Sequence, residues 1–135
     1  MATQKTELFE SRSGLSSQLR VEALTIQPRK FATGSGTLAQ LTPVAFNTST
    51  LKYVPWDQDG SNGTNVIEGF VWPDAIVLDG SDEVLGNVLL GGKLHFDDLP
   101  AATDVDANAT AAGWNAALRA AKTFGLYVEG VPADV

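Results

Sequence analysis

Residues 41–72 read LTPVAFNTSTLKYVPWDQDGSNGTNVIEGFVW and hold the clearest alternation of strand and turn signals in the chain. Apolar, β-branched and aromatic residues form three runs, at 41–46, 48–56 and 66–72. Such runs favour strands, and the Gly, Asn, Ser and Thr between them favour turns. Pro43 and Pro55 cannot donate a ladder hydrogen bond, so we expect them at strand ends or sheet edges. The stretch therefore predicts a β-rich domain.

Residues 88–96, VLLGGKLHF, carry the strand pattern further along the chain. Two apolar runs flank Gly91-Gly92, and glycine tolerates the positive φ angles of a tight turn. The stretch therefore predicts a β-hairpin that turns at these two glycines. Asp79-Gly80, earlier in the chain, predicts another turn.

Residues 106–122 are rich in alanine, the strongest helix former. An apolar stripe recurs there at helical spacing, formed by Trp114, Ala117, Leu118 and Ala121. We predict a helix whose stripe faces the core, with Thr103 or Asp106 as its N-cap and Gly125 at its end. A short strand at 126–128 closes the chain. Together these patterns predict a mainly β, α+β fold with one C-terminal helix.

Residues 1–40 differ from the rest and predict a flexible N-terminal arm, followed by a compact β-rich domain at 41–135. The arm contains two segments rich in Gly, Ser and Thr, SRSGLSS and ATGSGT. Between them apolar residues alternate with charged ones, which indicates a strand ending at Pro28. That strand must pair with the sheet of its own domain or with that of a partner, and the sequence leaves both possibilities open.

The chain of 135 residues has a net charge of −7, and the acidic excess lies in residues 41–135. An acidic body repels phosphate, so we expect no binding to nucleic acid. The chain has no cysteine, which excludes disulfides and thiolate metal sites. No apolar run approaches the roughly 20 residues of a membrane span. The first residues lack a signal-peptide pattern, so we expect synthesis in the cytoplasm.

The residues with catalytic potential do not form a recognisable active-site pattern. His95 is the only histidine, and no G-x-S-x-G or phosphate-binding glycine motif accompanies it. In a strand, His95 would share a face with Lys93, which predicts an ordinary half-exposed histidine. We therefore expect a protein without enzymatic activity and without a cofactor.

One loop has the ligand spacing of a calcium site. Asp57, Asp59, Ser61 and Glu68 occupy the first, third, fifth and twelfth positions of residues 57–68. However, the bend of such a loop requires glycine where Asn62 stands, and the flanking segments read as strands instead of helices. We therefore expect no metal site, with a small calcium- or ligand-binding β module as the alternative.

The stretch 41–72 resembles the core of the head decoration proteins of lambda-type tailed phages, the capsid-stabilising protein D family. The similar segments are Leu41-Thr42-Pro43, Thr48-Ser49, Lys52, Trp56 to Gly60, Gly69, Gly92 to Leu99 and Ala121 to Phe124. They follow one another in the family's order and cover roughly residues 34–128. Residues 73–86 and 101–113 have no clear counterpart there.

The resemblance implies a small, β-tulip-like fold with an extended N-terminal arm. It further implies a homotrimer on the outer surface of the virion, at three-fold and quasi-three-fold positions of the expanded head. There the family binds the major capsid protein and stabilises the shell against the pressure of packaged DNA. In that family the N-terminal arm orders on the shell and adds a strand to the capsid protein.

By that analogy, the apolar residues of the predicted arm strand are the expected capsid contact. They are Leu19, Val21, Ala23, Leu24 and Ile26. The alternation slips at Ala23-Leu24, so the sequence does not assign which of them face the shell.

Overall fold

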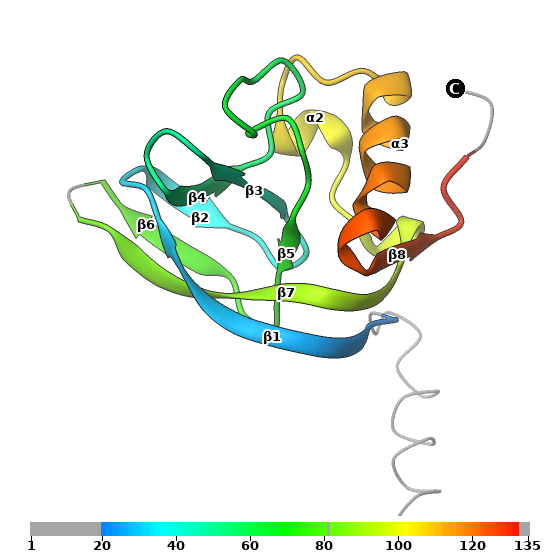
Figure 1. Ribbon diagram of the computed structural model, residues 1–135, viewed down its shortest axis with the longest axis horizontal. Helices are drawn as coiled ribbons and strands as arrows, with labels where there is room; N and C mark the ends of the chain where they lie inside the picture. Colours follow the sequence, from blue (N-terminus) through cyan, green and yellow to red (C-terminus); the bar gives the residue numbers. More distant parts are fainter. Residues whose placement is uncertain (1–19, 81, 133–135) are drawn as a thin grey trace, which may run out of the picture.

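The computed structural model describes residues 20–80 and 82–132. It is mainly β, with a six-stranded mixed sheet, a two-stranded sheet and one full helix near the C-terminus (Figure 1). The predicted α+β class with a C-terminal helix is thereby confirmed. The strands are β1 (Glu22–Phe31), β2 (Ser35–Leu38), β3 (Pro43–Asn47), β4 (Lys52–Pro55), β5 (Gly69–Val71), β6 (Ile76–Asp79), β7 (Val84–His95) and β8 (Leu126–Glu129).

The large sheet has the order β1-β4-β3-β5-β7-β8, and an additional pairing of β1 with β7 closes five of these strands into a ring. The three strands expected in residues 41–72 are β3, β4 and β5, and Pro43 and Pro55 stand at strand ends as predicted. Ring closure between β1 and β4 rests on the single pair Phe31↔Tyr53. Glu83 reinforces it by ion pairs with both Lys30 and Lys52.

Strand β7 corrects the prediction of a hairpin at residues 88–96. It runs without a turn from Val84 to His95, so Gly91 and Gly92 lie inside one strand. Gly92 has a φ of 145° and stands opposite both Ala23 of β1 and Leu126 of β8. A Cβ at Gly92 would collide with the backbone oxygen of Glu22. The glycine therefore allows a close approach between strands where the sequence suggested a turn.

Residues 22–38 also depart from the expected division of the chain at residue 40. β1 pairs with β7 from Glu22↔Lys93 to Phe31↔Val84, and β2 pairs with β6. Both segments belong to the folded domain because partners far away in the sequence satisfy their backbone groups. This corrects the prediction of a flexible arm reaching residue 40, whereas residues 1–19 lie outside the described part.

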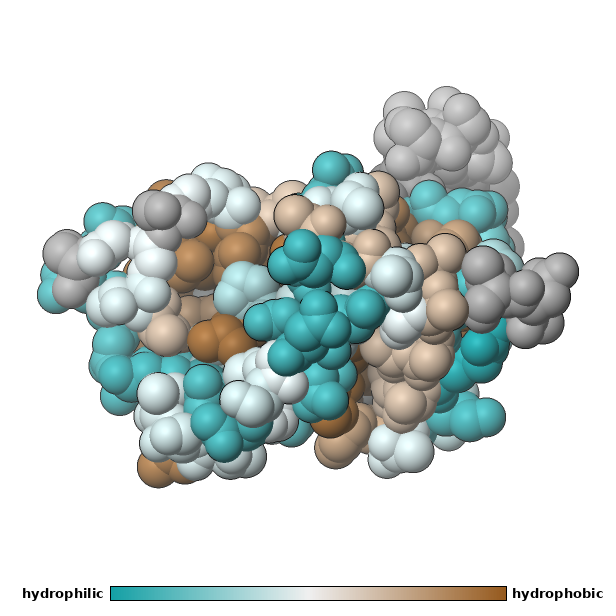
Figure 2. Space-filling view, turned by 90° about the horizontal axis from the view of Figure 1, so that it is seen from above, coloured by the Kyte–Doolittle hydropathy of each residue, from teal (hydrophilic) through white to brown (hydrophobic). Residues whose placement is uncertain are grey.

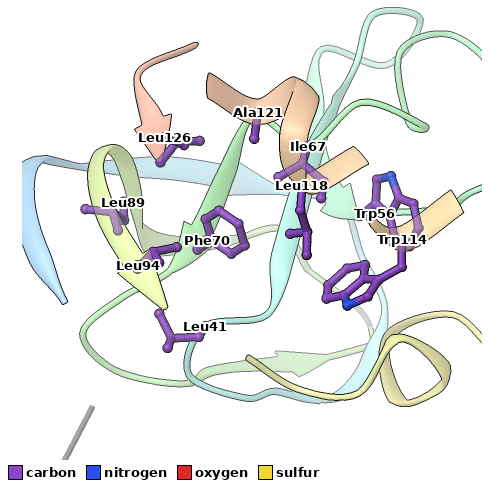
Figure 3. Close-up of a cluster of buried hydrophobic side chains, with 10 residues drawn as sticks. All are labelled: Leu41, Trp56, Ile67, Phe70, Leu89, Leu94, Trp114, Leu118, Ala121 and Leu126. Atoms are coloured by element: carbon purple, nitrogen blue, oxygen red, sulfur yellow. The ribbon is translucent and has the colours of Figure 1, made fainter. Parts of the chain in front are cut away.

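Two hydrophobic cores lie on opposite faces of the sheet. Phe70 and Val71 are neighbours in β5 but belong to different cores, as do Val88 and Leu89 in β7. The reason is that successive side chains of a strand point to opposite faces. The core beneath the helix, here called the helix-side core, consists of Leu41, Trp56, Ile67, Phe70, Leu89, Leu94, Trp114, Leu118, Ala121 and Leu126 (Figure 3).

Helix α3 (Ala111–Ala120) begins later than predicted, because Thr110 is its N-cap and accepts a hydrogen bond from Gly113 N at 3.1 Å. A 3-10 turn, η2 (Ala121–Phe124), extends it to Gly125, whose left-handed φ of 84° ends it as expected. Residues 106–110 of the predicted helix instead form a loop. This loop follows the short helix α2 (Ala102–Val105), and α2 itself follows the 3-10 turn η1 (Phe96–Asp98). Trp114 anchors α3 as predicted, packing on Trp56 with ring centroids 5.3 Å apart.

Gln58 ties the loop after β4 to the start of α3. Its Oε1 accepts a hydrogen bond from Thr110 N at 2.8 Å, and its backbone N–H donates to Asp106 Oδ2 at 2.9 Å. The Gln58 side chain lies directly against Gly113, where a Cβ would collide with Oε1 and approach Cγ to 3.1 Å. Glycine inside α3 therefore makes room for this long-range contact, at a cost in helix propensity of about 1 kcal/mol.

We predict that Gly113→Ala destabilises the protein by about 1–2 kcal/mol, because the displaced Gln58 loses its bonds to Thr110. Helix propensity alone would give the opposite sign. In a Gln58→Ala background the clash is absent, so the same substitution should stabilise by about 1 kcal/mol. Urea denaturation of the four proteins measures this coupling. Stabilisation by Gly113→Ala in the otherwise unchanged chain would contradict the role given to Gln58.

Candidate functional site

Strand β1 has one paired and one unpaired edge. On one side it follows β7 over its whole length. On the other side, within residues 20–80 and 82–132, only Phe31 at its end meets a strand, at Tyr53 of β4. The second edge from Glu22 to Lys30 therefore presents backbone donors and acceptors that no strand of the described chain uses. Such an edge is a template for pairing with another chain.

Strand β1 also exposes apolar side chains. Residues 22–28 are exposed, with Leu24 at 82% and Ile26 at 41% of full accessibility. Leu85 of β7, which is 71% exposed, lies opposite Lys30 in the ladder. Directly paired residues share a sheet face, and so do residues four positions apart in one strand. The pairs Lys30↔Leu85 and Ile26↔Leu89 therefore place Leu85 and Ile26 on the same face. Figure 1 shows β1 as the lower border of the molecule, away from α3.

The five residues predicted as a capsid contact separate into three groups. Ala23, Leu24 and Ile26 lie on the exposed part of β1. Val21 is half-buried and packs against the helix-side core, so it helps to hold β1 in place. Leu19 lies outside the described residues. The slip at Ala23-Leu24 corresponds to a real irregularity, since the β1–β7 register shifts between Ala23 and Thr25.

Arg20 fixes the start of β1 against η1. Its backbone N–H and Nε donate to Asp98 Oδ2 at 2.9 and 3.2 Å, and Nη2 donates to Oδ1 at 3.1 Å. Burial by itself raises the pKa of Asp98, but the hydrogen bonds and positive charge of Arg20 outweigh it and leave that pKa below its ordinary value. No local sequence pattern indicates this pair, because 78 positions separate its members.

The loop with calcium-like spacing is folded by its own hydrogen bonds. Asp57 Oδ1 accepts from Asp59 N at 3.1 Å, and the backbone oxygen of Ser61 accepts from both N and Oγ1 of Thr64. Glu68 lies beyond the loop, with its N–H bonded to Val44 O of β3, and partial burial raises its pKa. Among the described residues, no three His, Asp or Glu side chains are grouped to hold a metal ion.

The loop and α3 form the upper face of the molecule. Seen from above, polar surface (teal) covers the region of the loop between β4 and β5, and paler, more apolar surface lies beside it over the alanine-rich helix (Figure 2).

His95 is half-exposed as predicted, and its Nδ1 accepts a hydrogen bond from Asp97 N at 3.3 Å. In the part of the chain that the structure describes, no helix is long and apolar enough to cross a membrane.

No protein-family model matches the chain, and no curated protein matches it.

We predict that Asp98→Asn loosens the start of β1, because it removes the charge and one acceptor oxygen from the contact with Arg20. Trypsin should then cleave after Arg20 about two- to fivefold faster, the modest effect expected of an exposed pair. Asp104→Asn, at an exposed carboxylate in α2, is the matched control. Mass spectrometry of the early digest gives the rates, and equal rates for the two variants would show that the pair does not hold the strand.

We also expect the Arg20–Asp98 contact to weaken in acid. The folded-state pKa of Asp98 lies below its unfolded value of about 3.9, so the stabilisation is complete above that pH. It is lost as the pH falls through the lower folded-state pKa. The NMR signal of the Arg20 Nε–H should shift along this titration, and in Asp98→Asn the shift should be absent.

Proposed function

We propose that this protein is a structural protein of a phage virion that binds the outside of the expanded head. As in the family it resembles, it would act as a homotrimer at three-fold and quasi-three-fold positions and stabilise the shell against the pressure of packaged DNA. Its partners would be the major capsid protein and further copies of itself. It would be made in the host cytoplasm and act without catalysis, cofactor or metal.

The observation that carries this proposal is the unpaired edge of β1 with its exposed apolar residues. Main-chain groups along such an edge give affinity to an added strand, and alternate side chains give specificity. Leu24 and Ile26 supply apolar contact beside those groups. The edge thus offers both components of strand addition to a capsid subunit.

The pairing of β1 with β7 changes how docking would work. A free arm would have to lose its conformational freedom at the moment of binding, which costs a few kcal/mol. Here β7 and the Arg20–Asp98 contact already hold β1 extended. The capsid subunit would therefore meet a preformed strand, and less of the binding energy would be consumed by ordering it.

The charge of the chain supports a protein partner instead of DNA. With a net charge of −7, the chain repels the phosphate backbone, so binding to nucleic acid is disfavoured. An outer position on the shell also keeps the protein away from the packaged DNA.

We predict that Leu24→Asp weakens binding to expanded heads at least about tenfold, because a charge would be buried in an apolar contact. Point substitution is preferable to deletion of the strand, since β1 is part of the sheet. The matched control is Leu51→Asp, which adds the same charge at a residue 68% exposed in the β3–β4 turn. Heads of the same phage that lack the protein are mixed with each variant and sedimented. Equal binding of both variants would remove β1 from the interface.

We predict that the protein sediments as a trimer in solution. Sedimentation equilibrium over a range of concentrations measures the mass without a capsid present. A monomer throughout that range would oppose the trimeric part of the proposal. Leu24→Asp should remain trimeric, which separates a loss of head binding from a loss of assembly.

A further inference from the structure

A groove lies beside the last strand, β8, and is called here the β8 groove. Its volume is about 320 Å³, at the lower end of the range typical of ligand sites. Its lining includes Lys93, Arg119, Lys122, Tyr127, Val128 and Glu129. These residues are distinct from those of the β1 edge, and the inference drawn from them does not depend on the proposed function.

Strand β8 has an edge that no described strand covers. It is the last strand in the order of the large sheet, so within residues 20–80 and 82–132 no strand pairs with its second edge (Figure 1). Tyr127 and Val128 are neighbours that point to opposite faces, with Val128 packed against the helix-side core. Both line the groove, which therefore touches both faces of β8. Because β7 occupies one edge of the strand, the groove must reach around the other, unpaired edge.

The β8 groove concentrates positive charge on an acidic chain. Residues 41–135 contain four basic residues, and three of them, Lys93, Arg119 and Lys122, line the groove. One acidic residue lies among them, Glu129, which pairs with Lys93 at 3.4 Å. By contrast, a larger groove between η1, α2 and α3 has no basic residue in its lining. The β8 groove therefore favours a negatively charged occupant.

Most donors of the helix-borne cations are available to such an occupant. Arg119 uses one of its five donors, on Nη2, for the backbone oxygen of Pro132. The Lys122 ammonium forms no ion pair or hydrogen bond with a residue that the structure describes. Both residues stand near the C-terminal end of the helix, where positive charge complements the helix dipole. That role leaves their remaining donors free to meet carboxylates.

The charge of the groove and the edge of the strand together select the occupant. A free carboxylate would meet the cations but would leave the backbone groups of the edge unused. An extended peptide uses both, because its main chain pairs with the edge while its side chains enter the groove. The net charge of −7 disfavours nucleic acid. We propose that the β8 groove binds an extended acidic segment of another protein, which adds a strand to β8 and places carboxylates beside Arg119 and Lys122.

The test uses the full chain and the probe acetyl-Val-Glu-Val-Glu-Val-amide, whose β-branched residues favour an extended chain and whose glutamates supply two carboxylates. NMR titration should show saturable shifts at the backbone amides of residues 126–129. The peptide with lysine in place of both glutamates should bind at least about tenfold more weakly, because its charges meet like charges in the groove.

Two N-methylated peptides separate strand addition from charge attraction. Successive N–H groups of an added strand point alternately toward the edge and away from it. One peptide is methylated at both glutamate nitrogens and the other at the central valine nitrogen. The peptide methylated on the side that faces β8 should bind at least about tenfold more weakly than its isomer, because it lacks the hydrogen bonds to the edge.

Lys122→Gln should weaken the binding of the unmethylated probe about three- to fivefold, the effect expected of an exposed charge pair. Arg29→Gln is the matched control, since it removes the same charge at a residue of β1 that does not line the groove. It should bind the probe as the unchanged chain does. A lower thermal midpoint in Lys122→Gln with unchanged binding would assign this lysine to the helix dipole alone and contradict the proposal.

Further outcomes would also overturn the proposal. One is the absence of a saturable shift with the probe, and another is equal affinity for the two methylated peptides, which would show charge attraction without strand addition. Equal affinity for glutarate would indicate a site for a small anion. Tighter binding by a chain ending at Pro132 would make residues 133–135 the occupant. Self-association that is lost in Lys122→Gln would make a second copy of this chain the occupant.

Discussion

The continuity of β7 is the constraint on which the rest of the structure depends. This strand pairs with β1 and β5 and, beyond the irregularity at Gly92, with β8. Its adjacent residues Val88 and Leu89 enter the two cores on opposite faces. A hairpin turn at Gly91-Gly92 would separate these partners and divide both cores. Gly92 permits the close approach of β1 to β7 at this point, because a Cβ there would collide with the backbone oxygen of Glu22.

Contacts between distant segments then place the surfaces that could bind other molecules. Arg20 and Asp98 set the start of β1 beside η1, and Gln58 holds the loop after β4 against the start of α3. The first contact presents the unpaired edge, whereas the second helps to position the helix that carries Asn115. Both contacts join segments that are far apart in the sequence.

The two surfaces differ in the chemistry that they offer. The β1 edge supplies a row of backbone groups with apolar side chains beside them, which suits the addition of a strand. A groove lined by Phe96, Trp114 and Asn115 among others is instead mostly apolar. The acidic balance of the chain disfavours nucleic acid at either surface.

The sequence by itself determined the β-rich class, the three strands of residues 41–72, the C-terminal helix with its Trp114 anchor and the helix end at Gly125. These follow from local preferences of side chain and backbone. Only the tertiary structure decided that β1 pairs with β7, that Gly92 joins strands instead of turning them, and that Asn115 is buried. Each of these depends on partners far away in the sequence, and no local pattern of residues encodes which distant backbone or cavity a residue will meet.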